Sequence, residues 1–448
     1  MTSLLLYAVP LGGGLLVALL AGRRGWSPPL WATLLVAIAL RVVLLVFTQR
    51  YGPQPYDLTY DFQDTAKNVV AGTEPVLGVR YGGWHFLPMM AYVLAGQYAL
   101  GELLGVPWPV IARLVPMAAD LVLLVLIGRL ADEFGAGKGN LRRFQYACLP
   151  LALMVSSVHG QIVPIALAFG VGALLMALRG RPILGGVLVG FAAAANSWPA
   201  LLIPGVILAL TGLRPRLVAG AWAIAVPGLF FLSETVVFGV PISELPALAK
   251  AILSTRPVTG EWGWSAILTN GAQVVDPAIS RIGTPLLLAA LVVVFVVWRK
   301  AHPITLTAAV LMIFLIVTFR MGAQYLLWPL PYLLARPPAR GLTPYIVASG
   351  VWSFWGYIYL TRLTREEWLV QHDTWTLQSP VVIASLVYAF PSPRPWRRPL
   401  PEGGEHAEPD KRPRASGDTP DGRAAASPDE AEPDPSTDEP AEREGARA

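Results

Sequence analysis

The sequence predicts an all-α protein, a polytopic bundle of about thirteen transmembrane helices followed by a disordered tail. Hydrophobic residues make up 54% of the 448 residues and charged residues only 14%, and the mean hydropathy is +0.53. A soluble domain carries roughly 25% charged residues, so most of this chain belongs where ionised groups are costly, as they are in lipid. Apolar stretches of helical length recur along the chain up to residue 391.

The expected helices follow these apolar stretches. Several stretches are shorter than the ~20 residues that span a bilayer, so the boundaries between neighbours stay open. The stretches are 3–21, 30–48, 110–131, 144–158, 161–178, 183–197, 199–212, 217–235, 284–299, 303–319, 325–336, 342–360 and 377–391.

The stretch 83–104 is also apolar, and loop charge decides its placement. Membrane proteins carry an excess of Lys and Arg in cytosolic loops. The basic loops of this chain all face one side only if 83–104 does not cross, so we interpret it as re-entrant or as lying on the outer surface. The N-terminus is then outside and the C-terminus inside. The basic loops hold Arg23, Arg24, Lys138, Arg142, Arg143, Arg179, Arg181, Arg214, Arg216, Arg299, Lys300, Arg336, Arg340, Arg397 and Arg398.

This topology places the long segments 49–109, 236–283 and 361–376 outside, and we expect helices within the first. Residues 1–391 form the transmembrane domain. The remaining 392–448 form an acidic cytosolic tail, which is predicted to be disordered because it lacks apolar periodicity.

Charge divides along the same line. From residue 401 on there are 14 acidic and 6 basic residues, and subtracting these from the totals of 29 and 34 leaves 15 and 28 for the body. The basic residues of the body are spread over short loops rather than gathered on one face, which argues against nucleic acid as a partner.

The first outer segment concentrates acidic residues. Asp57, Asp61 and Asp64 recur at spacings of four and three, which a helix places on one face. Like charges so close repel unless a cation, metal or substrate compensates them. A half-buried carboxylate with a raised pKa can serve as a general base. The alternative is a solvated helix start that its aspartates cap.

Other polar residues lie at the outer ends of the expected helices. Arg80 and His85 can hold a phosphate and position a sugar, or anchor the chain at the interface. His159 and Gln161 occupy a turn from which a side chain can reach an outward cavity, or which simply holds a satisfied histidine. Arg320 can bind an anionic lipid substrate or reach the lipid headgroups, and it is followed by Gln324 and Tyr325.

Two ionisable residues fall inside expected spans. Arg41 is near the middle of its helix, and Asp120 lies in the next definite span. An isolated charge in a membrane costs several kcal/mol. We therefore predict that Arg41 and Asp120 pair with each other in a structural role.

Five short motifs between residues 30 and 380 have counterparts in one known family. They are Asp57 with Tyr60, Ala66 and Gly72; the stretch Tyr81 to Pro88; the helix with Arg113, Pro116 and Asp120; the turn His159 to Gln161; and the run Gln324 to Trp328. In these motifs the chain resembles the GT-C-type membrane glycosyltransferases, particularly the bacterial polyprenyl-phosphate-mannose-dependent mannosyltransferases. The run Asn196 to Pro199 lacks the Lys that many members carry before a Trp-Pro pair.

The resemblance implies a GT-C-like hexosyltransferase. Such an enzyme moves a sugar, mannose by the resemblance, from a polyprenyl-phosphate donor to a lipid or glycan acceptor on the outer face of a bacterial cytoplasmic membrane, with inversion. Asp57 is then the first candidate for the base, Asp61 the second and Asp64 the third. Phosphate or sugar contacts fall to Arg80, His85, His159 and Arg320, with Gln161, Gln324 and Tyr325 in support. No cofactor is required, and a divalent metal on the aspartates stays open.

Two alternatives remain at this point. A lipid or polyol transporter would have paired broken helices near the midplane and an internal repeat, and we find no repeat in the sequence. A non-catalytic membrane scaffold of a glycan pathway would bind lipid-linked sugar or partner enzymes without chemistry.

Overall fold

The computed structural model describes residues 2–51, 54–77, 84–135, 137–253, 262–271, 277–337 and 340–395. Within these residues the chain is helical, and extended pairing is limited to one bridge between Ala301 and Pro395, which confirms the all-α fold. The chain divides into a compact unit, Met1–Trp396, and a second unit, Arg397–Ala448, that lies outside the described residues. The predicted disorder of the tail therefore falls outside the described part of the chain.

Five helices of the described chain are long and apolar enough to cross a membrane. They are α1 (Thr2–Arg24), α2 (Leu30–Tyr51), α5 (Trp108–Glu133), α11 (Leu213–Val237) and α14 (Pro277–Trp298). Each contains an apolar stretch of 21 to 26 residues, which matches the thickness of a bilayer. These helices support a membrane protein, whereas the count of thirteen spans stays a prediction.

Several of the expected spans are broken into shorter pieces. Leu149, for example, is extended between α6 and α7, as expected for the residue before a proline. Irregular backbone is tolerated in a membrane protein where other helices bury it. The shorter helices before α14 are α6 (Gly139–Cys148), α7 (Pro150–Leu153), η2 (Met154–His159), α8 (Val163–Leu178), α9 (Pro182–Ala195), η3 (Trp198–Leu202), α10 (Ile203–Ala209), η4 (Ile242–Glu244), α12 (Leu245–Leu253) and α13 (Gly263–Leu268). Those after it are α15 (Pro303–Val317), η5 (Ala323–Leu327), α16 (Leu330–Ala335), α17 (Leu342–Phe354), η6 (Trp355–Tyr359), η7 (Leu360–Arg362), α18 (Arg365–Leu377) and α19 (Ser379–Ala389).

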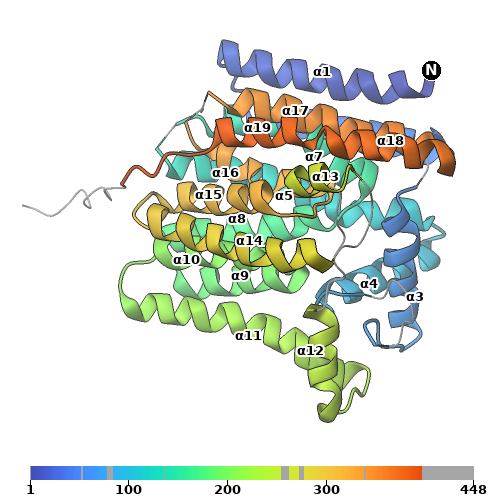
Figure 1. Ribbon diagram of the computed structural model, residues 1–448, viewed down its shortest axis with the longest axis vertical. Helices are drawn as coiled ribbons and strands as arrows, with labels where there is room; N and C mark the ends of the chain where they lie inside the picture. The colour runs from blue at the N-terminus through green and yellow to red at the C-terminus, as the bar shows by residue number, and fades with distance from the viewer. Residues whose placement is uncertain are drawn as a thin grey trace, which may run out of the picture. The chain divides into compact units, whose positions relative to one another are not determined.

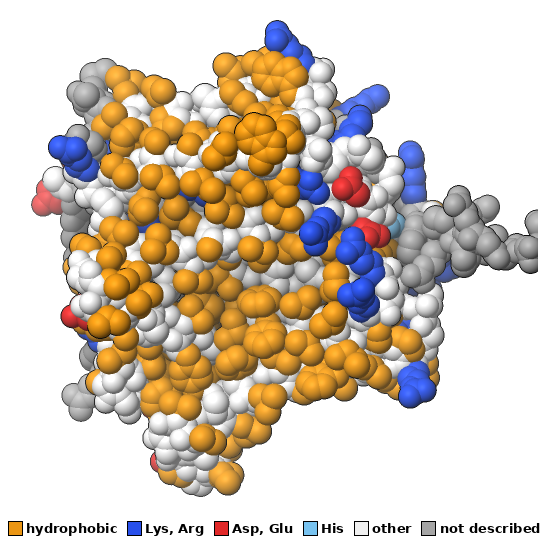
Figure 2. Space-filling view, turned by 180° about the vertical axis from the view of Figure 1, so that it is seen from behind, with side chains coloured by type: hydrophobic (Ala, Val, Ile, Leu, Met, Phe, Trp, Pro, Cys, Tyr) orange, Lys and Arg blue, Asp and Glu red, His pale blue; other side chains and the backbone are white. Residues whose placement is uncertain are grey.

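Helix α5 lies at the centre of the packing. It contacts α2, α4, α6, α8 and α16, while α9 packs between α8 and α11. Many of these helices run side by side in Figure 1, with α1 and α11 at opposite edges. In Figure 2 hydrophobic side chains cover much of one face, and most of the Lys and Arg side chains on that face lie toward its right-hand edge.

The stretch 83–104 contains one helix, α4 (Met89–Leu104), which packs against α3 (Gln63–Val70) and α5. Helix α4 has 16 residues and ends at Gly105, whose φ of 65° stops the helix. It is shorter than the five helices of spanning length. In Figure 1, α3 and α4 lie together at the right-hand end of the bundle, which we call the site end.

The second long loop carries η4, α12 and α13 between its ends. Trp262 is fully buried and donates its indole N–H to the carbonyl of Leu315 at 2.5 Å. Trp264 donates to the carbonyl of Val317 at 2.8 Å. These two tryptophans therefore fasten α13 to the end of α15, while residues 254–261 of the same loop lie outside the described chain.

The predicted pairing of Arg41 with Asp120 is confirmed. Both side chains are fully buried, and the guanidinium donates to one carboxylate oxygen through Nε at 2.8 Å and Nη2 at 2.5 Å. The Tyr146 hydroxyl donates to the other oxygen at 2.5 Å. A buried charge is stable only when it is paired and hydrogen-bonded, and this cluster joins α2, α5 and α6.

We expect Arg41→Leu and Asp120→Leu each to destabilise the protein by about 3–5 kcal/mol, because either change leaves an uncompensated buried charge. The double variant should be more stable than the sum of the two losses predicts. Unfolding in detergent followed by circular dichroism measures this. Tyr146→Phe, which removes one hydrogen bond, should cost about 1 kcal/mol. Strictly additive losses would contradict a direct pairing.

Candidate active site

Asp57 opens η1 (Asp57–Phe62), a π-helical segment directly before α3. Its side chain is 28% exposed, so one part of the carboxylate faces outward while the rest is enclosed. The imidazole Nε2 of His159 lies 2.7 Å from Oδ1 and 2.8 Å from Oδ2. The Leu58 backbone N–H donates to Oδ1 at 2.9 Å, and the Gln161 amide donates to Oδ2.

Gly160 explains how His159 and Gln161 both reach Asp57. Its φ is 80°, a conformation that favours glycine, and it ends η2 just before α8. A Cβ at this position would lie 2.7 Å from Cγ of Arg113. Only glycine therefore satisfies both the turn and the close approach of α5. The sharp turn places the two polar side chains next to each other, with the Gln161 Nε2 3.0 Å from the His159 Nε2.

Helix α5 anchors the two segments that carry these residues. The Trp108 indole donates to the carbonyl of Leu58 at 2.8 Å, which fixes η1. The fully buried Arg113 donates to the carbonyl of Val158 through Nε at 3.0 Å and Nη2 at 2.7 Å, which fixes the end of η2. Helix α5 therefore holds both the segment that carries Asp57 and the segment that carries His159.

The environment shifts the two aspartates of η1 in opposite directions. Burial alone would raise the pKa of Asp57, but the charge and hydrogen bond of His159, together with the Leu58 amide, lower the pKa below its ordinary value. Burial, followed by the nearby charges of Asp57 and Asp64, raises the pKa of Asp61 to about 6. The raised carboxyl pKa that we predicted for the cluster therefore falls on Asp61, and Asp57 is ionised at neutral pH.

Asp57 lines a small pocket of about 150 Å³, which we call the carboxylate pocket. Its polar lining comes from five separate stretches of the chain, and aromatic rings complete it. The polar residues are Asp57, Asp61, Thr65, His85, Gln161, Asn196 and Gln324, and the aromatic residues are Phe62, Trp84, Phe86 and Tyr325. The pocket offers an ionised carboxylate and several hydrogen-bonding groups to a small polar ligand.

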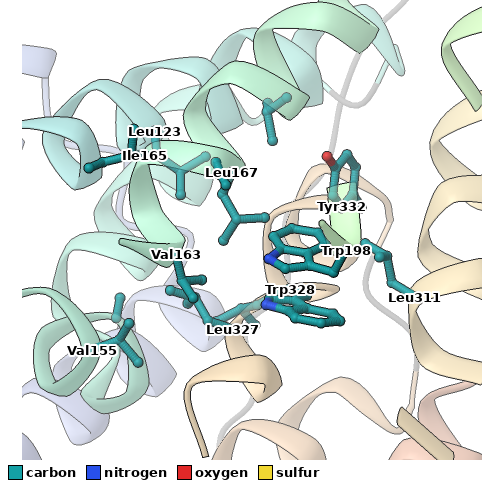
Figure 3. Close-up of a cluster of buried hydrophobic side chains, with 14 of the residues drawn as sticks. Leu123, Val155, Val163, Ile165, Leu167, Trp198, Leu311, Leu327, Trp328 and Tyr332 are labelled. Atoms are coloured by element: carbon teal, nitrogen blue, oxygen red, sulfur yellow. The ribbon is translucent and has the colours of Figure 1, made fainter. Parts of the chain in front are cut away.

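A larger pocket of about 470 Å³ adjoins it, and we call this the aromatic pocket. It shares four residues with the carboxylate pocket: His85, Phe86, Asn196 and Tyr325. Leu253, Leu287 and Phe314 give it apolar walls, and Arg320 brings a cation. Its lining also includes two stacked tryptophans, Trp198 and Trp328, with ring centroids 4.0 Å apart and planes 14° apart (Figure 3).

Tyr357 is a member of the cluster that we did not predict. It lies on η6, and its ring meets the His159 imidazole edge-on with centroids 4.8 Å apart. Its hydroxyl donates to the Gln324 side chain at 3.3 Å. Asp57, His159 and Tyr357 each lie on a π-helical segment, and such segments are frequent at functional sites. In the sequence Tyr357 stands in an apolar, aromatic run, which gives no polar signal.

The structure brings most of the predicted site residues together. Asp57, Asp61, His85, Gln161, Gln324 and Tyr325 line the carboxylate pocket, and Arg320 lines the aromatic pocket. His159 lines neither pocket and instead contacts Asp57. Arg80 lies outside the described residues.

Asp64 differs from the prediction. We expected it on one face with Asp57 and Asp61, but its side chain is exposed and it does not line the pocket. The physical reason is that η1 has the wider i→i+5 winding of a π-helix. Residues beyond η1 are therefore rotated relative to a continuous α-helix.

Within the described residues, no group of three or more His, Cys, Asp or Glu side chains gathers as metal ligands. No protein-family model and no curated protein sequence matches the chain. The function must therefore be argued from the geometry of the two pockets.

Asp61→Asn should raise the melting temperature at about pH 8, because the wild-type protein must ionise a carboxyl whose folded pKa is about 6. As the pH falls through 6 toward the ordinary value of 3.8, Asp61 becomes protonated and the difference should shrink to nothing. Differential scanning calorimetry across this range measures the effect. An Asp61→Asn effect independent of pH would contradict the assignment.

Proposed function

We propose that this chain is a membrane glycosyltransferase that moves a sugar from a polyprenyl-phosphate donor to a hydroxyl of a lipid or glycan acceptor. The observation that carries the proposal is Asp57. It is an ionised carboxylate held by His159 and Gln161 in a polar pocket that joins a larger pocket with apolar walls and a cation. A polar reaction chamber beside an amphiphilic pocket suits a substrate with a sugar head, a phosphate and a hydrocarbon chain.

The aromatic pocket suits the donor lipid. Ile252, Leu253 and Leu287 offer apolar surface from α12 and α14, and Arg320 offers a guanidinium to the phosphate. Exposed apolar side chains continue along α14, with Leu286 49% and Leu288 58% exposed. A polyprenyl chain can therefore lie against α14 while its phosphate meets Arg320.

The chemistry follows from this placement. The acceptor hydroxyl enters the carboxylate pocket and attacks the anomeric carbon of the sugar. Asp57 receives the hydroxyl proton as the new carbon–oxygen bond forms. The bond from the anomeric carbon to the phosphate oxygen breaks, and polyprenyl phosphate leaves with the electron pair. One displacement inverts the anomeric centre, and a phosphate leaves without help from a general acid.

His159 and Gln161 keep Asp57 ionised and fixed during this step. Because His159 contacts Asp57 and not the pocket, we assign it the role of holding the base. Asp61 lines the same pocket, but no hydrogen bond to its carboxylate is present among the described residues, so its position is less constrained. We therefore place Asp57 first and Asp61 second as the base.

Loop charge supports an extracytoplasmic site. The positive-inside rule assigns the basic edge of the bundle to the cytosol, and most Lys and Arg side chains on one face gather toward a single edge (Figure 2). Asp57 and Asp61 follow α2, at the end opposite to Arg23 and Arg24 of α1 and their neighbours in the chain. This orientation supports a carboxylate pocket on the outer side of the membrane.

We expect Asp57→Asn to lower kcat for sugar transfer by about 10²–10⁴-fold, the usual contribution of a general base. The amide keeps the shape of the side chain but accepts no proton. The measurement is transfer from polyprenyl-phosphate mannose in proteoliposomes, together with lipid profiles of a deletion strain complemented with each variant.

Asp64→Asn is the matched control, since it removes an exposed carboxylate from the same segment and should leave kcat near the wild-type value. Loss of transfer in Asp61→Asn but not in Asp57→Asn would move the base to Asp61. Restoration of the lipid profile by Asp57→Asn and by Asp61→Asn alike would overturn the enzymatic proposal and favour a scaffold or transporter.

A further inference from the structure

Asn196 stands where the two pockets meet. It follows α9 in an extended conformation, with φ −160° and ψ 154°, and it precedes η3. Only 7% of the residue is exposed, yet it lines both the carboxylate pocket and the aromatic pocket. The other residues shared by the two pockets are His85, Phe86 and Tyr325, so Asn196 supplies the carboxamide of the junction.

The Asn196 carboxamide is also unpaired within the protein. Among the described residues, no hydrogen bond to its side-chain oxygen or nitrogen is formed. Its amide oxygen and nitrogen are not sealed inside the protein but reach the space of the pockets, so they are accessible to a ligand there. Because Asn196 borders two pockets, a ligand that bridges them is the group that would satisfy it.

We propose that Asn196 recognises the sugar of the donor lipid at this junction and is a specificity-determining residue of the transfer. This inference rests on the proposed function. The three side chains differ in charge and suit different parts of the substrates. The anionic Asp57 suits the acceptor hydroxyl and the cationic Arg320 suits the phosphate. The neutral amide of Asn196 borders both pockets. A carboxamide donates and accepts at once, which matches a sugar hydroxyl, since a hydroxyl also does both.

The surroundings narrow the class of sugar. The rings of Phe86 and Tyr325 border the same junction and offer flat apolar surface. Asp57 and Asp61 lie in the adjoining chamber, so a sugar that carries a carboxylate would meet like charge. The donor sugar is therefore one that carries no carboxylate, rather than a uronic acid.

Lipid binding tests this without relying on catalysis. The full-length protein is placed in nanodiscs and titrated with polyprenyl phosphate and with polyprenyl-phosphate mannose. We expect the wild-type protein to bind the sugar-bearing lipid more tightly. Asn196→Ala should lower the affinity for the sugar-bearing lipid by about tenfold, which is the effect of losing one hydrogen-bonded contact. Its affinity for bare polyprenyl phosphate should not change.

Two further variants sharpen the comparison. Gln378→Ala, which removes an exposed carboxamide outside both pockets, should leave both affinities as in the wild type. Arg320→Gln should lower the affinity for both lipids by the same factor, because both lipids carry the phosphate. Asn196→Leu has nearly the shape of the native side chain and removes its hydrogen-bonding groups without adding a charge, so it replaces Asn196→Ala if the alanine variant does not fold.

The outcomes separate the two proposals. If Asn196→Ala lowers the affinity for both lipids equally, or for neither, the proposed role of Asn196 is overturned. The glycosyltransferase proposal then stays intact. Equal binding of both lipids by the wild-type protein also overturns the role of Asn196, since no sugar contact then exists. A wild-type protein that binds neither lipid overturns the proposed function itself.

Discussion

Polar groups inside an apolar bundle are costly without partners, and α5 supplies partners to three other segments of this chain. Trp108, Arg113 and Asp120 lie along this one helix, and each bonds a different segment: η1, the end of η2, and the Arg41–Tyr146 cluster. Removing one partner from any of these contacts would lower the free energy of unfolding by a large fraction of its total. The helices around α5 are therefore held in register by hydrogen bonds as well as by packing.

These hydrogen bonds also position the side chains of the candidate active site. Because η1 and η2 are fixed on the same helix, Asp57 and His159 meet from residues 102 positions apart in the chain. The contact keeps Asp57 ionised despite its burial, so the protein has a charged side chain at the mouth of a small pocket without an unstable core. The neighbouring aromatic pocket contrasts with it, since its apolar walls and single arginine suit an amphiphile.

The sequence predicted the parts of this arrangement that follow from the cost of charge. Apolar runs indicated the helices, and two ionisable residues in such runs indicated the Arg41–Asp120 pair. Candidate residues were found by their types at helix ends, but the contact of His159 with Asp57 depends on how distant segments pack, which one sequence does not show. Asp64 was misplaced because hydropathy does not reveal π-helical winding. Tyr357 and Asn196 carried no signal, since an aromatic in an aromatic run and an amide in a short turn are ordinary locally.

The π-helical segments have a consequence for how this protein tolerates changes in length. A π-turn holds one residue more than an α-turn, so deleting one residue from η1, η2 or η6 restores regular winding. The helices on either side then keep their orientation, because the deletion removes only the extra residue that the π-turn accommodates. The bundle would keep its apolar surface, while Asp57, His159 or Tyr357 would point elsewhere. A related chain with one residue fewer at η1, η2 or η6 would thus share the scaffold of this protein but not its site. A related chain of equal length at these three segments would share both.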